Sequence, residues 1–193
     1  EFAYDHKNMV HIGGLILSMS KRIMNEVMST AEDIGVEILY QDTDSMHIVS
    51  DINNEPIENL KQEYFKRYNR ELDGSKLGQF HCDFEMPKGG IKTPYSELSI
   101  ILGKKAYYDR VVSFNEEGNK IVSNHFRMKG ASEISMTQPE LLINNKLEKI
   151  NNIEEVYEYL YEGKGVTFNL ACMGATSFKL GRHGITSRME FNR

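Results

Sequence analysis

Long apolar runs are missing from this 193-residue sequence, and cysteine is scarce. No stretch approaches the ~18 consecutive apolar residues of a membrane-spanning helix, so we expect no membrane partner. Two cysteines, Cys82 and Cys172, are too few for a disulfide scaffold or for a zinc site built from cysteines. We expect free thiols in a reducing intracellular compartment, the cytoplasm or nucleus of a host cell, and not a secreted protein.

The sequence also lacks an initiator methionine, a signal-peptide pattern, internal repeats and low-complexity tracts, and we expect it to be cut from a longer protein. A basic excess is missing too: the net charge of −5 argues mildly against nucleic-acid binding. The charge is unevenly spread, however. Residues 104–129 carry six Lys or Arg against three acids, whereas residues 140–162 carry two Lys against six Glu. The basic band would suit a surface that meets phosphates.

Apolar periodicity predicts two amphipathic helices. From Val10 to Ile34 apolar residues recur at intervals of three and four, which indicates one buried face, and Gly35 ends the helix. A second helix is expected over Ile57–Leu72, with an inner stripe of Leu60, Tyr64, Phe65 and Tyr68. Its basic residues suit either nucleic-acid contact or, alternatively, long side chains that cover a buried aromatic stripe. Residues 77–85 alternate like a strand.

The most informative segment is Tyr40-Gln41-Asp42-Thr43-Asp44-Ser45, which lies between two β-prone segments. Residues 36–50 are therefore expected to form a hairpin with acidic residues at its tip. Asp42 and Asp44 are two apart, so in near-extended backbone their side chains leave on the same side. Carboxylates held that close repel unless a cation lies nearby, and Mg²⁺ prefers oxygen ligands. We predict a metal site suited to phosphoryl transfer.

Other interpretations of this segment are weaker. Asp and Ser are ordinary residues of surface turns, and an isolated Asp-x-Asp would favour that interpretation. The Asp-x-Asp-x-Thr loop of haloacid-dehalogenase-type phosphatases feeds a helix, whereas a second strand follows here. A calcium loop would need a third acidic position, a central Gly and a closing Glu at offsets that this sequence does not provide.

Tyr-x-Asp-Thr-Asp-Ser resembles the C motif of family B DNA polymerases, which carries palm carboxylates of the nucleotidyl-transfer site. Further along, Lys105-Ala106-Tyr107 resembles the Lys-x-Tyr motif with which these enzymes hold the primer strand between palm and thumb. Arg127-Met128-Lys129-Gly130 resembles the Met-Lys-Gly segment that enters the thumb in protein-primed and related viral members. A plain strand-to-helix connection is the alternative for this last segment.

The resemblance implies an α+β fold: an antiparallel palm-type sheet backed by helices, followed by a smaller mixed α/β thumb-like subdomain. Residues 1–112 would be the C-terminal half of the palm, with the metal-binding hairpin at 36–50 and a primer-grip strand at 98–112. Residues 113–193 would be the thumb-like subdomain. One long strand is expected from 98 to 114, interrupted at 103–105. The other expected elements are a strand at 120–128, a short helix that starts at 137–140 and ends near Asn145, a helix at 153–161 and a strand at 166–170.

By the same resemblance the intact protein is a DNA-directed DNA polymerase that uses two Mg²⁺ ions, for which Mn²⁺ can substitute. Its partners would be primer–template DNA and dNTPs. Asp44 would bind metal directly, and Asp42 is the weaker catalytic assignment. The turn would be supported by Tyr40, Thr43 and Ser45, and the nucleic acid bound by Lys104, Lys105, Tyr107, Arg127, Lys129 and Gly130. Tyr108 is expected to point into the core.

Two family motifs are missing, Asp-x-x-Ser-Leu-Tyr-Pro and Lys-x-x-x-Asn-Ser-x-Tyr-Gly. We therefore expect the fragment to be inactive alone, because its set of metal ligands is incomplete. The rest of the polymerase chain, with its exonuclease, fingers and first half of the palm, would be its main partner, and a terminal protein is a further candidate. The alternative is a non-catalytic module that binds nucleic acid or protein and retains the hairpin as a relic.

Overall fold

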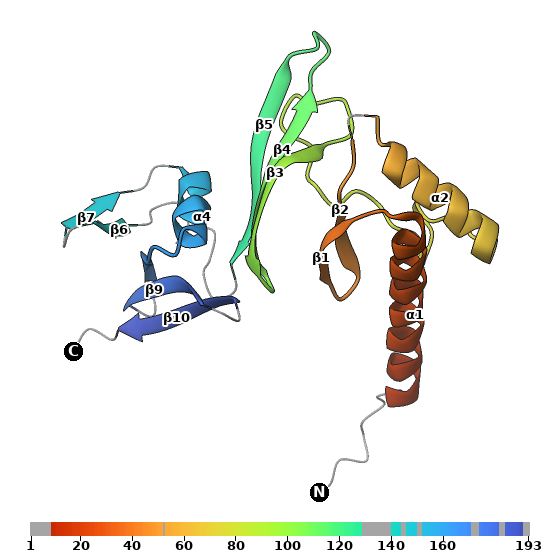
Figure 1. Cartoon of the computed structure of the whole chain (residues 1–193), viewed down its shortest axis with the longest axis horizontal. Coiled ribbons are helices and arrows are strands. Elements are labelled where there is room, and N and C mark those ends of the chain that lie inside the picture. Colours follow the sequence, from red (N-terminus) through yellow and green to blue (C-terminus); the bar gives the residue numbers. More distant parts are fainter. Residues whose placement is uncertain are drawn as a thin grey trace, which may run out of the picture. The chain divides into compact units, whose positions relative to one another are not determined.

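The computed structural model describes residues 9–51, 53–128, 140–143, 146–149, 152–170, 174–181 and 184–190, and the fold is α+β as predicted (Figure 1). The helices are α1 (Val10–Ile34), α2 (Glu55–Tyr68) and α4 (Ile153–Tyr161). The strands are β1 (Ile38–Asp42), β2 (Ser45–Ile48), β3 (Tyr95–Gly103), β4 (Ala106–Phe114), β5 (Lys120–Met128), β6 (Glu140–Ile143), β7 (Lys146–Lys149), β8 (Val166–Leu170), β9 (Gly174–Gly181) and β10 (Gly184–Glu190). Among these, α1, β5, α4 and β8 have the predicted bounds.

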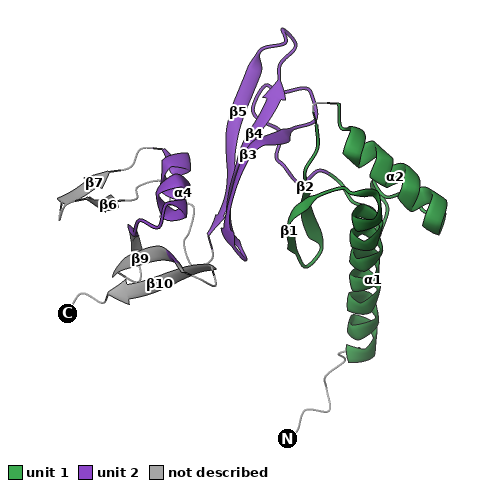
Figure 2. Ribbon diagram, in the orientation of Figure 1, with its two compact units in different colours: residues 1–81 green, residues 82–193 purple. Residues whose placement is uncertain are grey.

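The chain divides into two compact units, residues 1–81 and 82–193 (Figure 2). The functional boundary predicted after residue 112 falls inside β4, which pairs with β3 on one side and β5 on the other. Residues before and after 112 therefore belong to one sheet. Within the described residues, no helix is long and apolar enough to cross a membrane.

The first unit is built on the packing of α1 against α2. Gly35 ends α1 in the left-handed conformation, with φ of 74°, as predicted. Val27 and Ala31 of α1 are buried together with Leu60 and Tyr64 of α2. The second helix begins earlier than predicted because the Asp51 carboxylate accepts a hydrogen bond from the Glu55 backbone N–H, at 2.9 Å. It also ends earlier, at Tyr68, where Asn69 turns into the left-handed region at φ 50°.

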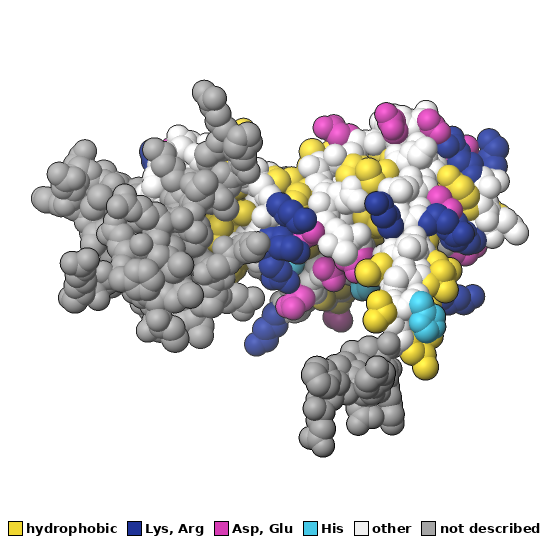
Figure 3. Space-filling view, turned by 90° about the horizontal axis from the view of Figure 1, so that it is seen from below, with side chains coloured by type: hydrophobic (Ala, Val, Ile, Leu, Met, Phe, Trp, Pro, Cys, Tyr) yellow, Lys and Arg dark blue, Asp and Glu magenta, His cyan; other side chains and the backbone are white. Residues whose placement is uncertain are grey.

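The apolar face of α1 is buried over its C-terminal half only, which corrects the prediction of one continuous buried face. The exposed large apolar residues of the N-terminal half are Met9, Val10, Ile12, Leu15, Ile16, Leu17 and Met19. Figure 3 shows hydrophobic side chains gathered around this end of the helix. Phe65 of α2, predicted to lie inside, is also 46% exposed. Helical periodicity identifies an apolar face but not the length over which a partner covers it.

Acidic partners bind the basic residues of α2, which favours the structural interpretation of that face. The ion pairs are Lys61 with Glu58 and Asp73, Lys66 with Glu63, Arg67 with Glu63 and Asp33, and Arg70 with Glu26. Arg70 also lies over the rings of Tyr64 and Tyr68, each at 5.6 Å from the centroid. These contacts cover the aromatic stripe with basic side chains, as the alternative interpretation expects.

The second unit contains an antiparallel sheet in the order β3-β4-β5. The single interrupted strand predicted over 98–114 is wrong, because the chain reverses at Lys104–Lys105 and forms a hairpin in which Gly103 pairs with Ala106. Lys105 adopts φ of 59°, which makes this reversal possible. One face of the sheet packs on α4 through a buried cluster of Leu102, Ala106, Tyr108, Met128, Val156, Tyr157, Leu160 and Val166. Tyr108 thus points into the core, as predicted.

A long irregular segment, residues 81–94, precedes the sheet. Residues 77–85 form no strand: Phe80 makes an isolated bridge to Asp73, and Leu77 is fully exposed. The segment instead contacts the sheet at single points, such as the hydrogen bond from the Ser113 hydroxyl to the Lys92 carbonyl at 2.6 Å. The later strands pair antiparallel in the order β10-β9-β8-β6-β7. The short helix expected up to Asn145 is wrong, because residues 140–143 pair as strand β6.

Candidate functional site

The acidic segment forms the predicted hairpin. Strands β1 and β2 pair antiparallel, with Asp42 opposite Ser45, so Thr43 and Asp44 alone make the turn. Asp42 ends the first strand and is half-buried, whereas Asp44 lies in the turn and is exposed. Asp44 lies outside the extended backbone, so strand alternation does not set the direction of its side chain. The turn itself carries the two carboxylates to one tip.

The turn at the tip is tight and strained. The Asp44 backbone N–H donates to the Asp42 carbonyl oxygen at 2.6 Å, across a single residue, which is the hydrogen bond of a γ-turn. The residue between them, Thr43, has φ of 50°. Positive φ is unfavourable for a β-branched residue, and such conformations persist only where surrounding contacts hold them. The tip is consequently held in one conformation that its own sequence disfavours.

Hydrogen bonds from both hydroxyl groups of the turn converge on Asp42. The Ser45 hydroxyl donates to the Asp42 carbonyl oxygen at 3.1 Å and so bonds to the backbone of the turn. The Thr43 hydroxyl donates to the Asp42 carboxylate oxygen Oδ1 at 3.2 Å instead of to the backbone. Behind the tip, the Tyr40 ring meets the His47 ring edge-on across the strand pair, at 5.3 Å. The Thr43 bond thus orients the Asp42 side chain, whereas the other two contacts brace the backbone and the strand pair.

The hairpin by itself does not form a complete metal site. Within the described residues there is no group of three or more His, Cys, Asp or Glu side chains that could hold a metal ion. Mg²⁺ takes six oxygen ligands, from carboxylates, phosphates and water. The carboxylates of Asp42 and Asp44 have the chemistry of such ligands, and both lie at a tight turn.

The residues predicted to bind nucleic acid fall into three groups. Lys104 and Lys105 are exposed in the β3–β4 turn, so Lys105 does not lie in a strand as expected. Tyr107 lies in β4 opposite Arg127 of β5; Tyr107 is half-buried, and Arg127 is exposed. The predicted positions Lys129 and Gly130 lie outside the described residues.

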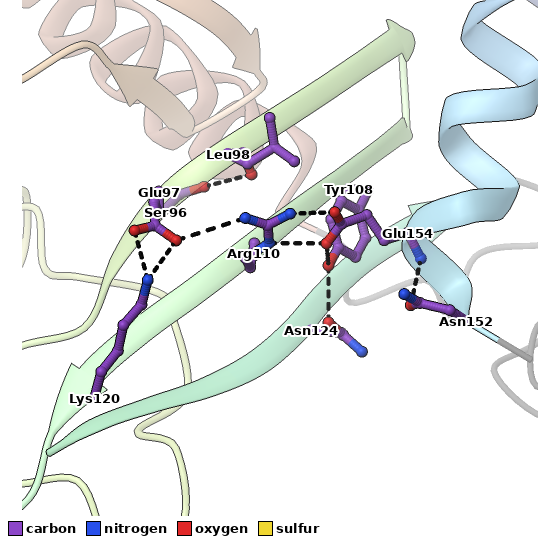
Figure 4. A network of polar contacts seen from close by, with 9 residues as sticks. All are labelled: Ser96, Glu97, Leu98, Tyr108, Arg110, Lys120, Asn124, Asn152 and Glu154. Atoms are coloured by element: carbon purple, nitrogen blue, oxygen red, sulfur yellow. Dashed lines mark hydrogen bonds and ion pairs between the residues drawn. The ribbon is translucent and has the colours of Figure 1, made fainter.

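Two cations of the basic band, Arg110 and Lys120, form ion pairs with glutamates that were not among the predicted site residues. Figure 4 shows the Arg110 guanidinium between Glu97 of β3 and Glu154 of α4. Lys120 donates to both carboxylate oxygens of Glu97, at 2.6 and 2.8 Å. The Tyr108 hydroxyl lies 2.8 Å from both Glu154 Oε2 and Asn124 Oδ1. The band therefore presents fewer cations to a phosphate than its sequence indicates.

These contacts also shift the protonation of the groups involved. The hydrogen bond from Arg110 lowers the pKa of the Glu154 carboxyl group, so it stays ionised over a wider pH range. Burial raises the pKa of the Tyr108 hydroxyl, which therefore remains a donor. The network attaches the first turn of α4 to the sheet. Arg110 and Glu154 are 44 residues apart in the chain, and no local pattern pairs them.

The first unit also has a shallow pocket of about 590 Å³, away from the hairpin tip. It lies where the end of α1 meets the start of α2, and its lining includes Gly35, Asp51, Glu55, Asn59 and Lys66. None of the residues predicted for catalysis or nucleic-acid binding lines it. The hairpin tip of the first unit and the β3–β4 region of the second unit therefore remain two separate candidate sites.

No family model, curated protein or solved structure matches this chain. A functional assignment consequently depends on the residues of the chain itself.

Proposed function

We propose that this chain is the later part of the palm, together with the thumb, of a DNA polymerase resembling family B. In the intact protein, the hairpin would contribute Asp42 and Asp44 to a two-metal site that adds nucleotides to a primer 3′ end. The observation that carries the proposal is the hairpin itself. Its motif lies in a two-residue turn, with an exposed Asp44 and a half-buried Asp42 fixed by neighbouring hydroxyls.

The reaction transfers a nucleotidyl group. The primer 3′-hydroxyl attacks the α-phosphorus of the dNTP, the bond to the bridging oxygen breaks, and pyrophosphate leaves. When bound, Mg²⁺ lowers the pKa of that hydroxyl and offsets charge on the leaving group. Asp44 offers an exposed carboxylate as a direct ligand. Asp42 adds negative charge in an orientation set by Thr43, and the tight turn limits how far either carboxylate can move.

A second region would hold the primer strand. Lys105 lies at the tip of the β3–β4 hairpin and Tyr107 two residues further along β4, so that a cation and an aromatic ring lie close together in the chain. Lysine contacts phosphate without regard to sequence, and a tyrosine ring packs against a sugar or base. This arrangement suits a grip on a primer end whose sequence varies.

The decisive test is Asp44→Asn in the full-length protein. Losing a carboxylate ligand removes several kcal/mol of barrier lowering, so primer extension should fall by at least about 100-fold. Asp83→Asn, at an exposed position in the irregular segment, is the matched control and should leave extension unchanged. Residues 1–193 alone should incorporate no nucleotide.

Primer–template affinity separates the proposal from the alternative of a non-catalytic module. Loss of extension with little change in affinity supports the polymerase assignment, because the chemical step alone is impaired. If Asp44→Asn keeps extension within about tenfold of the parent, the hairpin takes no part in catalysis and the assignment fails.

A further inference from the structure

A row of polar residues crosses the three-stranded sheet of the second unit. Ser99 of β3, Asp109 of β4 and His125 of β5 lie directly opposite one another in the strand register. Residues that face each other across antiparallel strands present their side chains on the same face, and so do residues two apart in one strand. Tyr107, two residues before Asp109, therefore belongs to this face as well.

Asp109 is the centre of the row. Its side chain is fully buried, and its Oδ1 atom accepts hydrogen bonds from the hydroxyls of Ser96, at 2.9 Å, and Ser99. Removing a carboxylate from water is costly unless hydrogen bonds compensate, and an apolar side chain would fill the same place at lower cost. The two serines hold this carboxylate in one position at the middle of the sheet.

His125 connects this row to Tyr107. Its ring lies 5.8 Å from the Tyr107 ring, at an interplanar angle of 31°. On another side the Phe84 ring approaches it edge-on, with centroids 5.4 Å apart. The imidazole thus lies against two aromatic rings, and its residue is directly opposite Asp109 in the strand register.

We infer that His125 and Asp109 are positioning residues, which hold the Tyr107 ring in the orientation needed to grip the primer strand. This inference rests on the proposed function, because it requires Tyr107 to contact nucleic acid. Asp109 acts on His125 from the neighbouring strand position, and His125 acts on Tyr107 through the ring contact. Neither residue touches the DNA.

A double-mutant cycle on primer–template affinity in the full-length protein tests the inference. An aromatic contact of this kind corresponds to about a 3- to 10-fold change in an equilibrium, so His125→Ala should weaken binding by that factor. His125→Phe keeps a ring against Tyr107 and should stay within about twofold of the parent. In a Tyr107→Ala background, His125→Ala and Asp109→Asn should each have no further effect, because residues that act through one partner are not additive.

The outcomes separate the inference from the function beneath it. If Tyr107→Ala itself leaves affinity unchanged, the proposed grip is wrong. If Tyr107→Ala weakens binding but His125→Ala does not, or its effect adds fully to that of Tyr107→Ala, the grip stands and the positioning role is refuted. Thermal unfolding of each variant provides the folding check. Should His125→Ala fail to fold, Asp109→Asn carries the cycle. It should weaken binding in the parent but have no further effect in the Tyr107→Ala background. No effect in the parent, or full additivity with Tyr107→Ala, refutes the inference.

Discussion

Replacing Thr43 by glycine should raise stability while lowering activity. Thr43 has φ of 50°, and the left-handed region costs a residue with a Cβ about 1–2 kcal/mol relative to glycine. Glycine also lowers the free energy of unfolding by about 0.5–1 kcal/mol, because it has more conformational freedom in the unfolded chain. It also loses the exposed hydrogen bond to Asp42, which contributes about 0.5 kcal/mol. The three contributions sum to between about −0.5 and +1 kcal/mol, so the expected net change is a slight stabilisation at the centre of that range.

Thr43→Val is the matched control, because it removes the same hydroxyl but keeps the β-branched side chain in the strained conformation. The glycine variant should therefore be more stable than the valine variant by about 1 kcal/mol, or about 2–4 °C in Tm. Thermal unfolding followed by circular dichroism measures this difference. In primer-extension assays of the full-length protein, the glycine variant should be slower, since a looser turn holds the carboxylates less firmly.

Two results would refute this reasoning. If the glycine variant melts at a lower temperature than the valine variant, the positive φ of Thr43 costs no stability at this turn. A glycine variant with full polymerase activity would mean that a rigid tip is not needed to position Asp42 and Asp44.

Three further predictions concern the second unit and α1. Lys105→Ala should weaken primer–template binding and reduce the salt dependence of the affinity by about one ion, and an unchanged slope would favour a purely structural role. Because Arg110 lowers the pKa of Glu154, that carboxylate stabilises the fold above its ordinary pKa of 4.5, and the stabilisation disappears as the pH falls below it. Glu154→Gln should accordingly flatten the loss of unfolding free energy between pH 5 and 3, measured by urea denaturation. Leu160→Ala, at a fully buried position, should cost about 3 kcal/mol, whereas Leu17→Ala, 68% exposed, should change stability by less than about 0.5 kcal/mol; equal losses would contradict the observed burial.

Elements with strong local signals could be predicted from the sequence. The bounds of α1 follow from its 3.6-residue period and from Gly35, and the acidic hairpin follows from two β-prone segments around a polar turn. Gly103 predicts an interruption within one strand, whereas in the structure it precedes a reversal of the chain. The distinction depends on whether the residues before it pair with those after it, and this is a non-local property.

Most contacts around the candidate site residues join residues that are far apart in the chain, so no local sequence pattern predicts them. Glu154 and Arg110 are 44 residues apart, and their pairing requires α4 to pack on the sheet. Asp109 gave a weak signal that could have been used, because a charged residue in the middle of a predicted strand needs a buried partner or an exposed face. Its partners Ser96 and Ser99 come from the neighbouring strand and become visible only once the register is known.

The half-covered helix α1 has a practical consequence for work with the purified protein. Residues 9–20 contain no Asp, Glu, Lys or Arg, and most of their large apolar side chains meet solvent. Sulfate and other strongly hydrated salts favour burial of such surface, while mild detergents cover it. Precipitation by ammonium sulfate should consequently begin at lower salt for the parent than for a variant with two of these leucines changed to lysine. The helix that packs behind the acidic hairpin thus also presents apolar surface on which such salts act.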